Sequence, residues 1–169
     1  AKFWNKLEST YREKLVKANA ENDMDADKEL AKKLPYREMS KNGWVPETRD
    51  TTEKVIHLRK YFEVVKLEII KNMQLSKIAC RRLAETEKSD LALLAWAQKA
   101  KLEARSIDTS LVDLKTLKKS LPEIRSMTTM NPSDFCPKLI ELLSGCGIAL
   151  VFLPHIGGSF LHGATFYDG

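Results

Sequence analysis

The residue types that most often carry out chemistry occur in this 169-residue chain without the spacing that catalysis requires. His57, His155 and His162 form neither an HExxH pair nor a His/Cys cluster at zinc spacing. His155 and His162 could share a ligand across a predicted hairpin, although polar residues beside a turn are the commoner explanation. Cys136 and Cys146 have no basic neighbour that would lower a thiol pKa. We therefore expect no catalysis by this chain itself, and no metal or other cofactor.

The charges indicate solvated helix faces more than a nucleic-acid surface. The chain has 28 Lys and Arg residues and 23 Asp and Glu residues, for a net charge of +5. All the basic residues except Lys138 lie at or before position 130, where acidic residues interleave with them. A duplex-binding surface needs basic residues concentrated on one face. Three short basic groups are the candidates for phosphate contact: Lys54–Arg59–Lys60, Arg81–Arg82 and Lys115–Lys118–Lys119.

Composition favours a protein of a reducing compartment. The chain is 43% hydrophobic and 30% charged, and its longest uncharged stretch, from Leu142 up to Asp168, is broken by glycines and Pro154. Such breaks do not fit a membrane-spanning helix. The three cysteines form no CxxC pair. We expect a cytoplasmic protein that does not contact a membrane.

Apolar residues at helical spacing predict a mainly α fold. Helices are expected over residues 2–20, 25–34, 36–41, from a cap at 50–52 to about 62, and over 67–72, 73–88, 90–105, 112–127 and 133–143. After Gly145 and Gly147 the pattern changes, and two apolar runs, 148–153 and 160–167, predict strands. The expected fold is thus a multi-helix region followed by a C-terminal β-hairpin that begins an α+β domain.

The C-terminal part is similar to the first part of the ImmA/IrrE-type metallopeptidase-like domain. In that family a helix ends in a turn like Gly145–Ile148, and a strand like Ala149–Pro154 follows. A second strand then carries Gly163–Thr165. Three upstream segments also resemble helices of the family: Lys77–Leu83, Asp90–Ala104 and Leu121–Met127.

The N-terminal part resembles the end of an Xre-type helix-turn-helix domain. The matching residues are Phe3, Trp4, Leu7, Glu8 and Tyr11, and Asn42–Pro46 resembles the element that follows in such regulators. The resemblance implies an inner fragment of an antitoxin-like transcriptional regulator. Residues 1–20 would be the last helix of a helix-turn-helix head, 21–130 a helical middle region and 131–169 the start of the peptidase-like domain. The DNA-reading helices would precede Ala1, and the HExxH helix would follow Gly169.

Three functions are compatible with these observations. The first is a regulatory or interaction segment, which contacts DNA only through the missing head. The second is a truncated piece of a zinc metallopeptidase of the ImmA/IrrE type, and the third is a helical scaffold without a ligand. Expected partners are a second copy, bound through the hairpin edge or the Phe3–Trp4 helix, and another protein such as a toxin. The candidate interaction residues are Phe3, Trp4, Tyr11, Trp44, Arg81, Arg82, Phe160 and Phe166.

Overall fold

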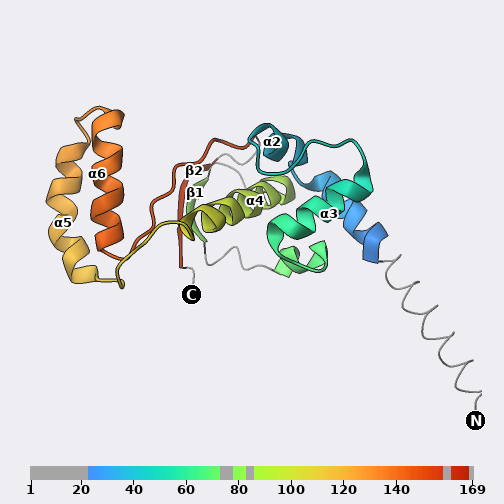
Figure 1. Ribbon diagram of the computed structural model, residues 1–169, viewed down its shortest axis with the longest axis horizontal. Helices are drawn as coiled ribbons and strands as arrows, with labels where there is room; N and C mark the ends of the chain where they lie inside the picture. The colour runs from blue at the N-terminus through green and yellow to red at the C-terminus, as the bar shows by residue number, and fades with distance from the viewer. Residues whose placement is uncertain (1–22, 73–77, 83–85, 158–160, 168–169) are drawn as a thin grey trace, which may run out of the picture. The chain divides into compact units, whose positions relative to one another are not determined.

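The computed structural model describes residues 23–72, 78–82, 86–157 and 161–167 (Figure 1). These residues are mainly helical, which confirms the predicted fold class. They divide into two compact units. The first unit takes in the described residues up to Gln98 and those from Pro154 onward, and the second unit is Lys99–Leu153. The domain boundaries expected from the family resemblance stay predictions.

The first unit begins with a helix over residues 23–33, followed by α2 (Tyr36–Lys41), α3 (Thr51–Phe62) and the 3₁₀ helix η1 (Leu67–Asn72). The predicted bounds of α2 and η1 are confirmed to the residue. Gly43 follows α2 with a φ of 71°, a conformation that glycine adopts without strain, as its position after the predicted helix end suggested. The Asp50 side chain accepts a hydrogen bond of 2.8 Å from the backbone N–H of Glu53 and so caps α3.

The apolar residues at helical spacing along α3 form part of the core of the first unit. Val55, Leu58, Tyr61 and Phe62 are all buried, and the rings of Tyr61 and Phe62 meet edge to face at 5.1 Å. The core also includes α4 (Glu87–Ala104), which is buried all round over Leu91–Ala95. The Tyr61 hydroxyl donates a hydrogen bond of 2.7 Å to the carbonyl of Ala95 in α4. Burial raises the pKa of Tyr61, so this hydroxyl remains a donor at neutral pH.

One buried carboxylate connects three segments of the first unit. Asp27 lies in the 23–33 helix with only 2% of its surface exposed. Its Oδ2 accepts a hydrogen bond of 2.7 Å from Nε of Arg59 in α3. Both carboxylate oxygens also accept from the backbone N–H of Leu67, at 3.0 and 2.9 Å, where η1 begins. A buried charge is tolerated when it is paired and hydrogen-bonded in this way.

The strands differ from the predicted hairpin. β1 (Ile78–Arg82) pairs antiparallel with β2 (Leu161–Phe166), and a register irregularity lies between Arg81 and Arg82. The predicted helix over 73–88 is therefore wrong at 78–82. Residues 148–153 form no strand. The strand predicted over 160–167 is present as β2, but it pairs with β1 and not with residues 148–153. Because β1 and β2 are distant in the sequence, local periodicity could not reveal their pairing.

The second unit contains an antiparallel pair of helices, α5 (Leu114–Met127) and α6 (Pro132–Gly145), which lie side by side (Figure 1). α5 begins two residues later than predicted and continues through Pro122. Its cap is Asp113, whose Oδ1 accepts from the backbone N–H groups of Lys115 and Thr116. α6 begins at Pro132, one residue before the predicted cap, because proline suits the first turn of a helix.

Candidate interaction surface

Half of the interaction residues predicted from the sequence lie outside the described residues. These are Phe3, Trp4, Tyr11 and Phe160, so their predicted role stays a prediction.

The other four candidates have defined backbone positions. Arg81, Arg82 and Phe166 all belong to the β1–β2 pair, where Phe166 is opposite Ile78 at one end and the arginines are opposite Gly163 and Leu161 at the other. The side chains of the two arginines lie outside the described residues, and Phe166 is half-buried. Trp44 belongs to the loop after α2 instead, where it is half-buried beside the buried Val45. The predicted interaction role of Trp44 stays a prediction.

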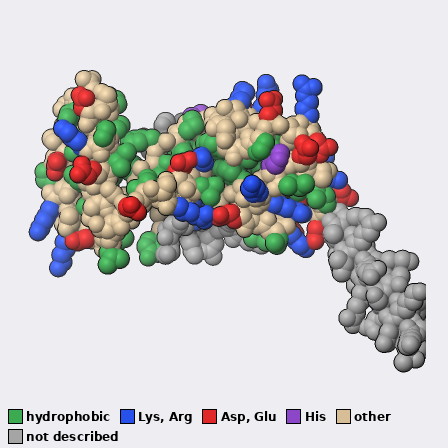
Figure 2. All heavy atoms as spheres, in the orientation of Figure 1, with side chains coloured by type: hydrophobic (Ala, Val, Ile, Leu, Met, Phe, Trp, Pro, Cys, Tyr) green, Lys and Arg blue, Asp and Glu red, His purple; other side chains and the backbone are tan. Residues whose placement is uncertain are grey.

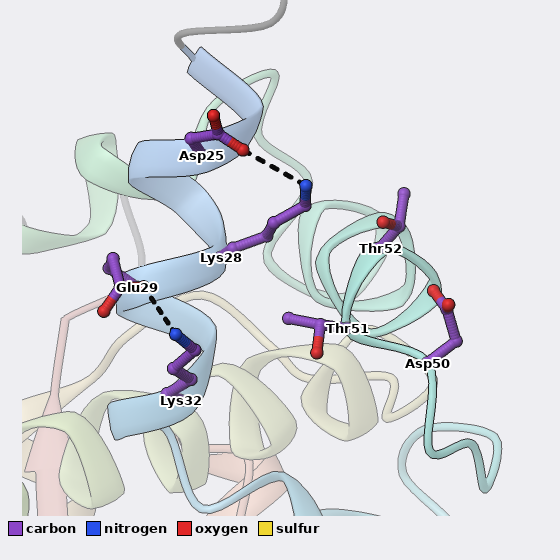
Figure 3. A pocket seen from close by; sticks show the side chains of 7 residues that line it. All are labelled: Asp25, Lys28, Glu29, Lys32, Asp50, Thr51 and Thr52. Atoms are coloured by element: carbon purple, nitrogen blue, oxygen red, sulfur yellow. Dashed lines mark hydrogen bonds and ion pairs between the residues drawn. The ribbon is translucent and has the colours of Figure 1, made fainter.

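A shallow groove of about 400 Å³ lies between the 23–33 helix and the start of α3 (Figure 3). Its lysines are already paired along their own helix: Lys28 with Asp25 at 3.1 Å and Lys32 with Glu29 at 2.5 Å. The N-terminus of α3 is capped by Asp50, which also lines the groove. These local pairs satisfy the groove's charges, so the groove offers no strong recognition of an ion.

A second groove, of about 450 Å³, lies over Tyr36. The Tyr36 hydroxyl donates to the Pro46 carbonyl at 2.7 Å, because that oxygen can only accept. His57 Nδ1 lies 2.7 Å from the oxygen of the same hydroxyl. Since the hydroxyl hydrogen is already donated to Pro46, Nδ1 carries the ring proton and donates it to the Tyr36 oxygen. Lys54 Nζ lies 5.6 Å from the centre of the Tyr36 ring. Burial, followed by the nearby Glu53 charge, raises the pKa of Tyr36, so its hydroxyl stays protonated at neutral pH. The hydrogen bond between this hydroxyl and His57 connects α2 to α3.

Within the part of the chain that the structure describes, no three His, Cys, Asp or Glu side chains are grouped so that they could hold a metal ion. Cys136 and Cys146 are free thiols, half-buried and buried respectively. None of the described helices combines the length and apolar character that crossing a membrane requires.

Most apolar side chains of the second unit are half-buried or exposed. Of all residues from Lys99 to Leu153, only Ala100, Met127 and Cys146 are buried. α6 has no buried residue, although six of its side chains are apolar. These are Phe135, Cys136, Leu139, Ile140, Leu142 and Leu143. Two packed helices with so little core expose more apolar surface than a self-sufficient fold usually does.

The most exposed apolar residues of the second unit surround the start of α5. Leu111 is 93% exposed, Val112 59% and Leu114 64%, and Leu121 follows two turns later at 43%. Figure 2 shows hydrophobic, basic and acidic side chains side by side on the visible face of the α5–α6 pair. We call Leu111, Val112, Leu114 and Leu121 the α5 surface.

The backbone beneath the α5 surface is fixed by contacts with the end of α6. Ser110 N–H donates to the Ser144 carbonyl at 2.9 Å, and Asp113 N–H donates to the Cys146 carbonyl at 3.1 Å. Gly147, with a φ of 81°, packs so closely that a Cβ there would lie 2.5 Å from the Val112 Cα. Leu111 and Val112 therefore project from an ordered backbone. Apolar groups held in place before binding lose less conformational entropy when a partner covers them.

Sequence reasoning did not identify the α5 surface. Leu114, Leu117, Leu121 and Ile124 recur at helical spacing, and such a stripe is usually taken as core. A sequence shows which side of a helix is apolar, but not whether another element covers it. The sequence feature that could have indicated this surface is Leu111–Val112, an apolar pair directly before the capping residue Asp113.

Comparison with protein-family models, with curated proteins and with solved structures gives no significant match to this chain.

Proposed function

We propose that this chain is a non-catalytic interaction segment that binds another protein through its second unit. The observation that carries the proposal is the α5 surface, whose apolar side chains are exposed on a backbone held by the Ser110–Ser144 and Asp113–Cys146 hydrogen bonds. Burying such side chains is the main driving force of protein association.

The proposed cellular role is regulatory and cytoplasmic. It rests on the resemblance of Phe3–Tyr11 and Leu139–Tyr167 to antitoxin-like transcriptional regulators with an ImmA/IrrE-type domain. In such a regulator, a helical segment between a DNA-binding head and a peptidase-like tail is a suitable place for a partner to act. A toxin is one partner that fits this role.

A selection with a matched control tests the interaction role. The full chain is used as bait against a phage library of bacterial protein segments, and selected binders are measured with the purified protein. We expect binders whose affinity falls by about tenfold or more in Leu111→Gln/Leu114→Gln, since central apolar contacts dominate binding energy. Ile56→Gln, which changes a similarly exposed residue (54%) of α3, should leave binding unchanged.

Two results would contradict the proposal. One is a selection that yields no binder. The other is a set of binders whose affinity is the same for the wild-type chain and for Leu111→Gln/Leu114→Gln.

A further inference from the structure

The side of α5 that carries the exposed leucines also carries cations. Leu114, Lys118, Leu121 and Arg125 follow one another at intervals of four, three and four residues. At 100° per residue they lie within about 60° of arc on one side of the helix. All four side chains are exposed, and apolar groups alternate with positive charges along the line. We call these four residues the α5 stripe.

The two cations of the α5 stripe have no anionic partner among the described residues. The half-buried Lys28 and Lys99 and the exposed Lys32 form ion pairs along their own helices. Lys118 and Arg125 form none with any residue that the structure describes. The acidic residue within α5, Glu123, projects about 180° away from Leu114 on the helix.

A second copy of this chain does not supply the missing negative charge. Packing α5 against its own copy would bring Lys118 and Arg125 close to like charges. The acidic residues of α6, Asp134 and Glu141, lie on the side of that helix away from Leu139 and the other apolar residues. The predicted helix over residues 2–20 has five Lys or Arg residues and only two Glu. None of these segments combines an apolar stripe with flanking acids.

We propose that the α5 stripe binds an acidic amphipathic helix of another protein. This inference rests on the proposed interaction function and adds the chemistry of the partner. Apolar side chains of the partner helix cover Leu114 and Leu121, while its Asp or Glu residues, spaced three or four positions apart, pair with Lys118 and Arg125. The exposed leucines supply the affinity, and the cations select the partner and fix its register.

A pair of matched peptides tests the charge selection. The acidic probe is an amidated helical peptide of about 18 residues, built from Ala, Leu and Glu, with Leu at every third or fourth position and Glu beside each Leu. The control peptide has Lys in place of every Glu. Titrated against the full chain at low salt, the acidic peptide should bind at least about tenfold more tightly than the basic one. Added salt should narrow that difference.

Charge-reversal variants locate the effect on one side of α5. Lys118→Glu/Arg125→Glu should reverse the preference, so that the basic peptide binds more tightly. Lys115→Glu/Lys119→Glu makes the same change in net charge about 90° and 130° around the helix from the centre of the stripe and should keep the original preference. Circular dichroism checks that each variant keeps the helix content of the wild type.

The outcomes separate this inference from the proposed function. If both peptides bind equally and Leu114→Gln/Leu121→Gln abolishes that binding, the proposal of an acidic partner helix is wrong. The proposed interaction function would still be supported. Failure of both peptides to bind also overturns the inference, while the phage selection judges the function independently. A dimer that depends on Leu114 and Leu121 and excludes the acidic peptide would show that a second copy occupies the stripe, which overturns it too.

Discussion

The two units of this chain use similar amphipathic helices with opposite results. In the first unit the apolar face of α3 is fully covered, and even a charged residue, Asp27, is buried with its hydrogen bonds satisfied. In the second unit α5 and α6 pack on each other, yet only Met127 of these two helices is buried. The same pattern of apolar residues therefore stabilises a fold in one unit and provides a surface in the other. What differs is the number of neighbouring elements that cover the helix.

The largest expected effect on stability belongs to Asp27. Asp27→Ala leaves Arg59 and the Leu67 N–H without their acceptor and should lower the free energy of unfolding of the first unit by about 4 kcal/mol. Urea denaturation followed by tyrosine and tryptophan fluorescence measures the change. Asp25→Ala removes an exposed carboxylate of the same helix and should alter stability little. Equal effects of the two substitutions would contradict the buried connection.

Two neighbouring glycines test the rigidity under the α5 surface. Gly147→Ala should cost about 1–3 kcal/mol, because alanine is strained at a φ of 81° and its Cβ would strike the Val112 backbone. Gly145→Ala meets no atom within 4 Å and should be tolerated. Thermal unfolding of both variants compares them. If Gly147→Ala were as stable as Gly145→Ala, the close approach of residues 112 and 147 would be wrong.

The exposed leucines of α5 should contribute little to folding. Leu114→Gln/Leu121→Gln keeps good helix formers at both positions, so stability should change by less than about 0.5 kcal/mol per site. By contrast, Leu58→Ala truncates a buried leucine of α3 and should lower the free energy of unfolding by about 3 kcal/mol. The same urea denaturation measures both variants. A large loss of stability in the double variant would place Leu114 and Leu121 in a core.

The smallest effect concerns the pH dependence of the α5 cap. Hydrogen bonds from the Thr116 side chain and from the Thr116 and Lys115 backbone N–H groups lower the pKa of Asp113. Because the pKa in the folded state lies below that in the unfolded state, the stabilising contribution is complete at neutral pH. It is lost as the pH falls through the folded-state pKa.

Amide chemical shifts of Lys115 and Thr116 during an acid titration follow this loss. Asp113→Asn retains a capping oxygen without a titrating charge and should abolish the transition. If the transition persisted in Asp113→Asn, the titrating group would be a residue other than Asp113.

Local signals in the sequence predicted much of the first unit. Pro35 and Gly43 bracket α2, and Asp50 caps α3, whose apolar spacing identified its buried face. The strands were harder, since β1 is recognisable only with its distant partner β2. The apolar run 148–153 has the composition of a buried strand, but a strand also needs an adjacent edge with which to pair.

The interaction surface shows a different limit of sequence reasoning. The interaction residues predicted from the sequence are aromatic residues and Arg81–Arg82, which are residue types enriched at interfaces. Leu114 and Leu121 look like core residues in the sequence, and only their exposure in the structure changes that interpretation. Coverage depends on the number of neighbours in space, which the residue types along one helix do not specify.

Hydrogen–deuterium exchange of the full chain, with and without the acidic peptide, tests the central claim most directly. The claim is that the second unit is a binding surface rather than a self-sufficient core. In the free chain, amides of α5 and α6 should exchange faster than those of α3, because little apolar burial opposes local opening. Addition of the peptide should slow exchange in α5 and leave α3 unchanged. Equal protection of all three helices in the free chain, with no change on adding the peptide, would contradict the account.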